Sequence, residues 1–119
     1  MRVLIVDNQP RARQGMIALL GAWHQLEEVR EAANGAEAIQ LVQENQPDII
    51  LMDARMPLMG GLEATRQIKA RWPLVKIILL SLYSDYEAPA LAAGADAFVS
   101  KSDAPEKLRK ALAQVMGKG

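Results

Sequence analysis

One short stretch of the chain, residues 49–53, constrains the fold more than any other. Four consecutive large apolar residues run directly into Asp53, and Pro57 follows shortly after. A short apolar run bounded by turn signals is typical of a strand that is buried on both faces, in the middle of a parallel sheet. We therefore expect Asp53 at the carboxyl end of a central strand. That end is where open α/β sheets bind their ligands.

Three other apolar runs carry a polar side chain at or near their ends. They are residues 3–6 before Asp7, residues 75–82 with Ser81 near the end, and residues 97–100 before Lys101. The segment 26–32 mixes apolar with charged residues, which suits a strand at the edge of the sheet. The sequence thus predicts five strands.

Between these runs, apolar residues recur at helical spacing, and helix-start signals accompany them. Pro10 suits the first turn of a first helix, which would extend through Trp23. Asn34 with Glu37 is a capping pair for the second helix, and Asp103 with Glu106 is expected to cap the last. A fourth helix is expected over residues 87–93, irregular or mobile because it contains a proline close to its first turn.

Strands that alternate with helices indicate right-handed crossovers, hence a parallel sheet with helices on both faces. At 119 residues the chain is expected to form a single domain. The sequence predicts a three-layer, doubly wound α/β fold.

Composition excludes several classes of function. Lysine plus arginine equals aspartate plus glutamate, 14 each, so no net positive charge draws the chain to nucleic acid or anionic lipid. The absence of cysteine excludes thiolate metal sites. No apolar run approaches the roughly 20 residues that span a bilayer, so a cytoplasmic location is expected. The lone histidine, His24, is interpreted as structural.

The polar residues at the strand ends are expected to share one pocket, because parallel strands bring their carboxyl ends to the same edge. Taken singly, each has a plainer interpretation: a turn or cap aspartate, a core hydroxyl, a surface lysine. Together, Asp7 and Asp53 suit Mg²⁺, which prefers hard oxygen ligands. A carboxylate can attack phosphorus, and Ser81 and Lys101 could orient and neutralise the phosphoryl oxygens. No glycine-rich phosphate loop is present.

The chain resembles the receiver domain of two-component response regulators over its whole length. The stretches that carry the resemblance are Val3-Leu4-Ile5-Val6-Asp7, Leu51-Met52-Asp53-Ala54-Arg55-Met56-Pro57-Leu58-Met59-Gly60-Gly61, Ile78-Leu79-Leu80-Ser81 and Ala93-Gly94-Ala95-Asp96-Ala97-Phe98-Val99-Ser100-Lys101.

The resemblance implies a flavodoxin-like, CheY-like fold with strand order 2-1-3-4-5. It implies that Asp53 accepts a phosphoryl group from a sensor histidine kinase, that Ser81 is the switch hydroxyl and that Lys101 binds the phosphate. Asp7 and the backbone carbonyl of Arg55 would belong to the Mg²⁺ shell. The implied activity is that of a signalling phosphoacceptor, limited to its own phosphorylation and dephosphorylation, and not that of an enzyme.

The same resemblance implies a conformational output. Phe98 stands where the family often has a switch tyrosine, although a core aromatic is an equally good interpretation. Movement there would remodel the face formed by the fourth helix, fifth strand and fifth helix, a possible homodimer surface. Ser81 and the pair Lys101-Ser102 resemble receivers joined to helix-turn-helix DNA-binding domains of the nitrate-regulator type, so a transcriptional output is expected.

The chain departs from the family pattern at two positions. Asn8 falls where the family places an acidic metal ligand, so we expect weakened Mg²⁺ binding. Leu82 replaces a usually small residue and is expected to narrow access to the site. Arg55 and Tyr83 occupy positions where bulk can shield an acyl phosphate from water.

Two alternatives remain open from the sequence. One is a pseudo-receiver, an interaction module with weak or no phosphorylation, which Asn8 and Leu82 favour. The other is a flavodoxin-like cofactor binder, which would share the architecture but lacks a phosphate-cradling loop.

Overall fold

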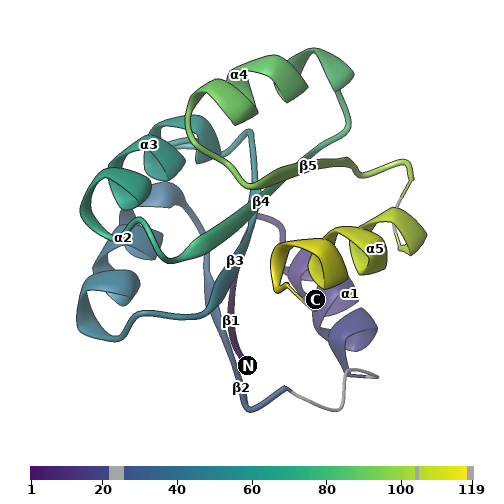
Figure 1. Ribbon diagram of the computed structural model, residues 1–119, viewed down its shortest axis with the longest axis horizontal. Helices are drawn as coiled ribbons and strands as arrows, with labels where there is room; N and C mark the ends of the chain where they lie inside the picture. Colours follow the sequence, from purple (N-terminus) through teal and green to yellow (C-terminus); the bar gives the residue numbers. More distant parts are fainter. Residues whose placement is uncertain (22–25, 104, 118–119) are drawn as a thin grey trace.

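Five strands build one parallel sheet in the computed structural model, which describes residues 1–21, 26–103 and 105–117. They are β1 (Arg2–Val6), β2 (Glu28–Ala32), β3 (Ile49–Asp53), β4 (Lys76–Ser81) and β5 (Ala97–Ser100). Their order in the sheet is β2-β1-β3-β4-β5 (Figure 1). This confirms the expected order and leaves the more polar β2 at an edge.

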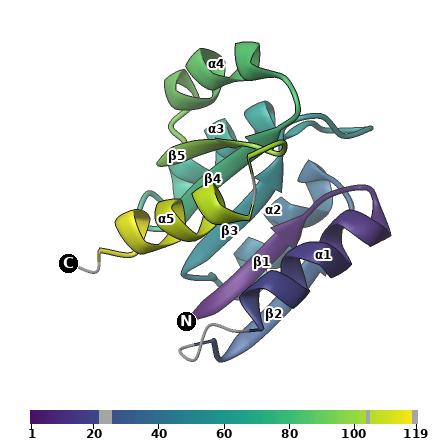
Figure 2. The same cartoon turned by 90° about the vertical axis from the view of Figure 1, so that its right-hand side faces the viewer.

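Helices cover both faces of this sheet. They are α1 (Pro10–Leu20), α2 (Gly35–Glu44), α3 (Gly61–Arg71), α4 (Glu87–Ala92) and α5 (Glu106–Val115), with a short 3₁₀ turn η1 (Ser84–Tyr86) before α4. Helices α2, α3 and α4 lie on one face, and α1 and α5 lie on the other (Figures 1 and 2). The three layers are those expected of a doubly wound fold.

Each face of the sheet buries its own hydrophobic core, because successive side chains of a strand point to opposite faces. In β3, Ile50 and Met52 pack with α2, α3 and α4, whereas Ile49 and Leu51 pack with α1 and α5. All five residues of β3 are buried. The apolar run that precedes Asp53 is therefore explained by burial on both sides.

Helix α3 begins in direct contact with the end of β3. Gly61 is its first residue, and a β-carbon there would collide with the carbonyl oxygen of Asp53 and crowd Leu79. Only glycine allows the two backbones to approach so closely. This packing fixes the position of the β3 end that carries Asp53.

Several local predictions are confirmed. The Asn34 side chain accepts a hydrogen bond from the Glu37 amide at 2.9 Å, as a helix cap does. A fourth helix is present at Glu87–Ala92, a six-residue α-helix that follows the 3₁₀ turn, and its expected irregularity or mobility remains a prediction. Gly94, at φ +107°, ends this segment in a conformation that favours glycine.

Several local predictions are wrong. β2 begins at Glu28 and not at residue 26, and β4 begins at Lys76 and not at residue 75. β4 ends at Ser81 and not at residue 82, since Leu82 is 64 % exposed and lies inside the turn that the Tyr83 amide closes on Ser81 Oγ. Asp103 and Glu106 do not cap α5, which begins at Glu106 without a side-chain cap hydrogen bond. The Asp103 carboxylate instead lies 3.7 Å from the ammonium of Lys107.

The predicted continuation of the first helix through Trp23 and the structural interpretation of His24 concern positions outside the described residues. No helix in the part of the chain that the structure describes is both long and apolar enough to cross a membrane.

Candidate functional site

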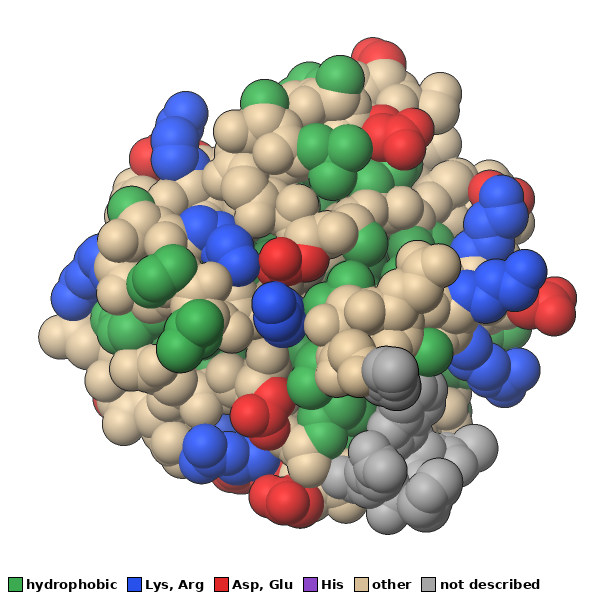
Figure 3. Space-filling view, viewed as in Figure 1, with side chains coloured by type: hydrophobic (Ala, Val, Ile, Leu, Met, Phe, Trp, Pro, Cys, Tyr) green, Lys and Arg blue, Asp and Glu red, His purple; other side chains and the backbone are tan. Residues whose placement is uncertain are grey.

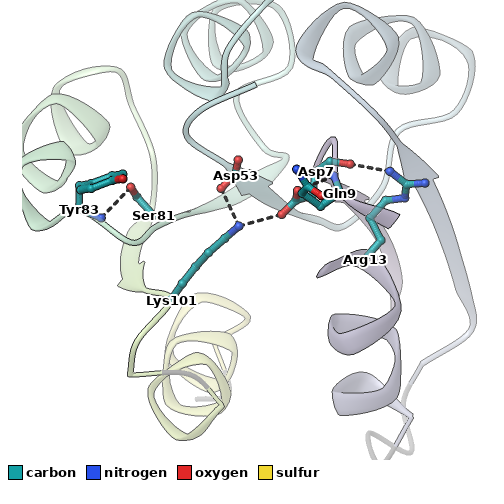
Figure 4. Close-up of polar contacts among 7 residues, drawn as sticks. All are labelled: Asp7, Gln9, Arg13, Asp53, Ser81, Tyr83 and Lys101. Atoms are coloured by element: carbon teal, nitrogen blue, oxygen red, sulfur yellow. Dashed lines mark hydrogen bonds and ion pairs between the residues drawn. The ribbon is translucent and has the colours of Figure 1, made fainter. Parts of the chain in front are cut away.

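The strand ends deliver their polar side chains to one open cleft at the carboxyl edge of the sheet. Its volume is about 230 Å³, and it is lined by Asp7, Asn8, Gln9, Asp53, Arg55, Ser81, Leu82, Tyr83 and Lys101. The expected gathering of Asp7, Asp53, Ser81 and Lys101 is therefore seen in the structure. Figure 4 shows how these four side chains lie relative to one another.

Lys101 joins the two aspartates. Its Nζ lies 2.9 Å from Asp7 Oδ2 and 2.8 Å from Asp53 Oδ1 (Figure 4). Two nearby carboxylates repel one another unless a cation lies between them, and here the ammonium has that position. Asp7 is fully buried and Asp53 only 8 % exposed, so these ion pairs are screened less than surface pairs.

Asp7 is held by the backbone around it. Its amide donates to the carbonyl of Ala32 at 3.1 Å, and its Oδ1 accepts from the amide of Gln9 at 2.9 Å. The second contact is an Asx-type turn, which aspartate favours because its short side chain reaches the backbone two residues ahead. The Asp7 carboxylate thus keeps a fixed orientation at the rim.

The pKa values of Asp53 and Lys101 are both raised. Burial raises the pKa of the Asp53 carboxyl above its usual 3.8 and outweighs the lowering by the hydrogen bond and charge of Lys101. Burial alone would lower the pKa of Lys101, but the hydrogen bonds and charges of Asp53 and Asp7 raise it above 10.5. Lys101 is therefore charged at neutral pH, and the Asp53 carboxylate is more basic than that of an ordinary aspartate.

The other side of the cleft is made by the loops after β3 and β4. Ser81 is buried, and its Oγ accepts a hydrogen bond from the Tyr83 amide at 3.0 Å. The Arg55 guanidinium carbon lies 5.3 Å from the centroid of the Tyr83 ring, within the range of a cation–π contact. Arg55 and Tyr83 thus connect the two loops beside Asp53.

The residues that line the cleft fit a Mg²⁺ ion. Among the described residues, no group of three or more His, Cys, Asp or Glu could hold a metal. Asp7 and Asp53 would therefore need further oxygen donors, which the Asn8 amide and the Arg55 carbonyl could supply. Mg²⁺ is commonly held by one or two carboxylates with waters completing its shell, so this donor set is adequate.

Phe98 is not among the residues that line the cleft. It is partly buried and packs against the core on the α2–α4 side of the sheet. The described structure therefore agrees with the core interpretation of Phe98, and its role as a switch remains a prediction.

Sequence reasoning missed two residues that organise the β1–α1 loop. The Gln9 amide binds Asp7 Oδ1, and the Arg13 side chain donates to the Asp7 carbonyl at 2.6 Å (Figure 4). A local turn preference of Asp7 could have indicated the first contact. The contact of Arg13 joins a helix side chain to the preceding loop, and the spacing of apolar residues does not predict such a contact.

The sheet order and the site together define an α/β domain with a CheY-like fold. The sequence model of the response regulator receiver domain matches residues 3–113. The chain belongs to this family.

Curated relatives include transcriptional regulators of about twice this length. The chain is 39 % identical over 112 residues to the uncharacterized transcriptional regulatory protein YhcZ of Bacillus subtilis (strain 168), covering 92 % of this chain and 52 % of YhcZ. It is 37 % identical over 117 residues to the response regulator UvrY of Escherichia coli (strain K12), covering 97 % of this chain and 54 % of UvrY. The chain thus spans about half the length of the curated relatives it matches.

Solved structures agree with this assignment. A LuxR-family two-component response regulator from Aurantimonas sp. SI85-9A1 superposes with a TM-score of 0.90 at 34 % identity, covering 97 % of this chain and 84 % of that one. The response regulator TrrA of Thermotoga maritima, solved in complex with Mg(2+)-BeF, has a TM-score of 0.87 at 31 % identity, with 96 % and 97 % covered.

Proposed function

We propose that residues 1–119 act as one phosphoacceptor domain of a two-component system, in which Asp53 receives a phosphoryl group from a histidine kinase. The observation that carries this proposal is the bridge of Lys101 to both Asp7 and Asp53, in a cleft that Ser81 also lines. A nucleophilic carboxylate, a fixed cation and a hydroxyl are the groups that phosphoryl transfer requires.

In the proposed reaction, a carboxylate oxygen of Asp53 attacks the phosphorus of a phosphohistidine. The phosphorus–nitrogen bond breaks, and its electron pair leaves with the imidazole, which takes up a proton. Water later attacks the acyl phosphate and restores the carboxylate with release of inorganic phosphate. No other substrate is transformed, so the domain acts as a signalling phosphoacceptor.

The side chains of the cleft have distinct parts in this reaction. The Lys101 ammonium, 2.8 Å from Asp53 Oδ1, would offset the negative charge of the phosphoryl oxygens. Asp7, Asp53, the Asn8 amide and the Arg55 carbonyl would hold Mg²⁺, which supplies Lewis-acid stabilisation when bound. Leu82 would narrow the entrance, and Arg55 and Tyr83 would limit the access of water to the acyl phosphate.

In this proposal, the Ser81 hydroxyl starts the conformational change that carries the signal. Its Oγ is bound to the Tyr83 amide, so turning toward a phosphoryl group would release that amide and change the β4–α4 loop. Phe98 could then move from the position that it has against the core. These movements would alter the face of α4, β5 and α5, which we propose as a homodimer surface.

The relatives, which include transcriptional regulatory proteins and a DNA-binding response regulator, favour a transcriptional output carried by a DNA-binding part outside the present chain, and we propose that the domain acts in the cytoplasm. The receiver itself is not expected to bind DNA. Its charges balance, and acidic and basic side chains are interspersed on the face shown in Figure 3.

Asn8 favours a second candidate function, the pseudo-receiver. An amide replaces the charge that an acidic ligand would supply beside Asp7, and such a module would interact with partners without phosphorylation. One experiment separates the two functions.

The test is incubation with acetyl phosphate and Mg²⁺, followed by intact mass measurement. We expect wild-type protein to gain the mass of one phosphoryl group, and neither Asp53→Asn nor wild type with excess EDTA to gain it. Asp85→Asn, which removes an exposed carboxylate from η1, is the matched control and should behave as wild type. A wild-type protein that never gains this mass would favour the pseudo-receiver.

A further inference from the structure

Arg13 lies outside the cleft but is bonded to the loop that forms it. From α1, its Nη1 donates to the backbone carbonyl of Asp7 at 2.6 Å, and its Nε donates to Glu31 Oε1 at 2.7 Å. The side chain is only 18 % exposed. The guanidinium therefore ties the β1–α1 loop to the end of the edge strand β2, as Figure 4 shows for its contact with Asp7.

The bond to the Asp7 carbonyl bears directly on Asn8. The backbone carbonyl of Asp7 and the backbone N–H of Asn8 belong to one planar peptide group. A hydrogen bond that fixes the carbonyl therefore also fixes the orientation of the backbone at Asn8. The Asp7 amide and carboxylate already have partners in Ala32 and Gln9. Arg13 adds a third restraint at the backbone carbonyl of Asp7, which is bonded directly to the nitrogen of Asn8.

The charge of Arg13 would by itself oppose a divalent cation in the neighbouring cleft. Glu31 neutralises much of that charge through its 2.7 Å ion pair. The remaining effect of Arg13 on the cleft is geometric, because its guanidinium is a rigid fork of donors that can hold two acceptors at once.

We propose that Arg13 is a positioning residue for Mg²⁺ binding, acting through the Asp7–Asn8 peptide and held in place by Glu31. This inference rests on the proposed function, since it concerns the cation of the same site. Outer-shell groups that orient metal ligands typically change metal affinity about tenfold to a hundredfold when removed. We expect a weakening of about tenfold for Arg13→Gln, because Asn8 contributes only one neutral ligand.

The test is a Mg²⁺ titration of the folded protein, followed through the ¹H–¹⁵N NMR signals of the Asn8 and Gln9 backbone amides. A positioning role and a purely electrostatic role of Arg13 predict opposite changes in Mg²⁺ affinity for Arg13→Gln. Loss of positioning weakens Mg²⁺ binding, whereas removal of a positive charge alone would tighten it. Arg13→Lys keeps the charge without the fork, and we expect it to bind more weakly than wild type and more tightly than Arg13→Gln.

Arg11→Gln is the matched control. It removes the same charge from the same helix, and the Arg11 side chain is exposed and has no hydrogen bond or ion pair within the described part of the chain. Because the Arg11 charge is exposed and screened by water, the affinity of Arg11→Gln should equal or slightly exceed that of wild type. Thermal unfolding of each variant sets the temperature at which all are folded, and Arg13→Lys carries the test if Arg13→Gln does not fold.

The outcomes are distinct. Weaker Mg²⁺ binding by the Arg13 variants, with Arg11→Gln no weaker than wild type, supports the proposal. Equal or tighter binding by Arg13→Gln, wild-type affinity in Arg13→Lys, or no Mg²⁺ response in wild type overturns it. If wild type responds to Mg²⁺ but takes up no phosphoryl group, the proposed function fails and the titration still decides the part of Arg13.

Discussion

Asn8→Asp should strengthen Mg²⁺ binding, because it restores a negative charge at the edge of the cleft. The three charged side chains that contact one another in the cleft, Asp7, Asp53 and Lys101, have a formal sum of −1, and the guanidinium of Arg55, which also lines the cleft, lies over the Tyr83 ring. The substitution makes that sum −2. Asn8 is only half-buried and the cleft is open, so water screens the added charge.

The magnitude follows from this screening. Two unit charges 4 Å apart in a water-like medium interact by about 1 kcal/mol, so a divalent cation gains about 2 kcal/mol. That corresponds to roughly a thirtyfold lower Kd. The added carboxylate also attracts the Lys101 ammonium, which competes with the metal, and we therefore expect a gain of about tenfold.

Isothermal titration calorimetry with MgCl₂ at constant ionic strength measures this change. Gln14→Glu is the matched control, since it adds the same charge at an exposed position of α1, and its Kd should stay near that of wild type. The reasoning is refuted if wild type binds Mg²⁺ as tightly as Asn8→Asp does. It is also refuted if the two variants gain affinity equally, because net charge alone would then explain the effect.

Three further predictions follow from particular contacts. The Asp53 carboxyl should titrate above pH 3.8 by ¹³C NMR, because its folded-state pKa is raised. Its contribution to the free energy of unfolding is therefore present below pH 3.8 and is lost as the pH rises through the folded-state pKa. Lys101→Met should raise the pKa of Asp53 further, and a lower titration midpoint in this variant would contradict the assigned causes. Thr65→Val should raise the free energy of unfolding by about 1 kcal/mol and Tm by roughly 4 °C, because the buried Thr65 hydroxyl has no partner among the described residues; a calorimetric Tm that falls would contradict this. Tyr83→Ala removes the ring that Arg55 contacts and should shorten the lifetime of the phosphorylated protein, and unchanged decay of ³²P-labelled protein would dispose of the shielding role.

The central strands could be predicted from sequence because burial on both faces leaves a plain record. Residues 49–52 are apolar without interruption, and β3 is buried throughout. The same logic assigned the polar β2 to the edge. Boundaries were less certain where local and tertiary preferences compete, as at Asp103, which pairs with Lys107 and does not cap α5.

The sequence predicts which residues gather at the site but not how their side chains contact one another. Parallel strands must bring Asp7, Asp53 and Lys101 to one edge, so topology alone groups them. That one ammonium contacts both carboxylates depends on side-chain conformations and on the exact packing of β1, β3 and the loop after β5. The contact of Arg13 with the Asp7 carbonyl likewise depends on how α1 leaves its loop, which no sequence spacing specifies.

Chemical trapping tests the central claim most directly. Borohydride reduces an aspartyl phosphate to homoserine, so peptide mass mapping after treatment with acetyl phosphate, Mg²⁺ and borohydride locates the acyl phosphate. We predict homoserine at position 53 and at no other aspartate. Homoserine at another position, or none in protein that has demonstrably bound Mg²⁺, would contradict the assignment of Asp53 as the phosphoacceptor.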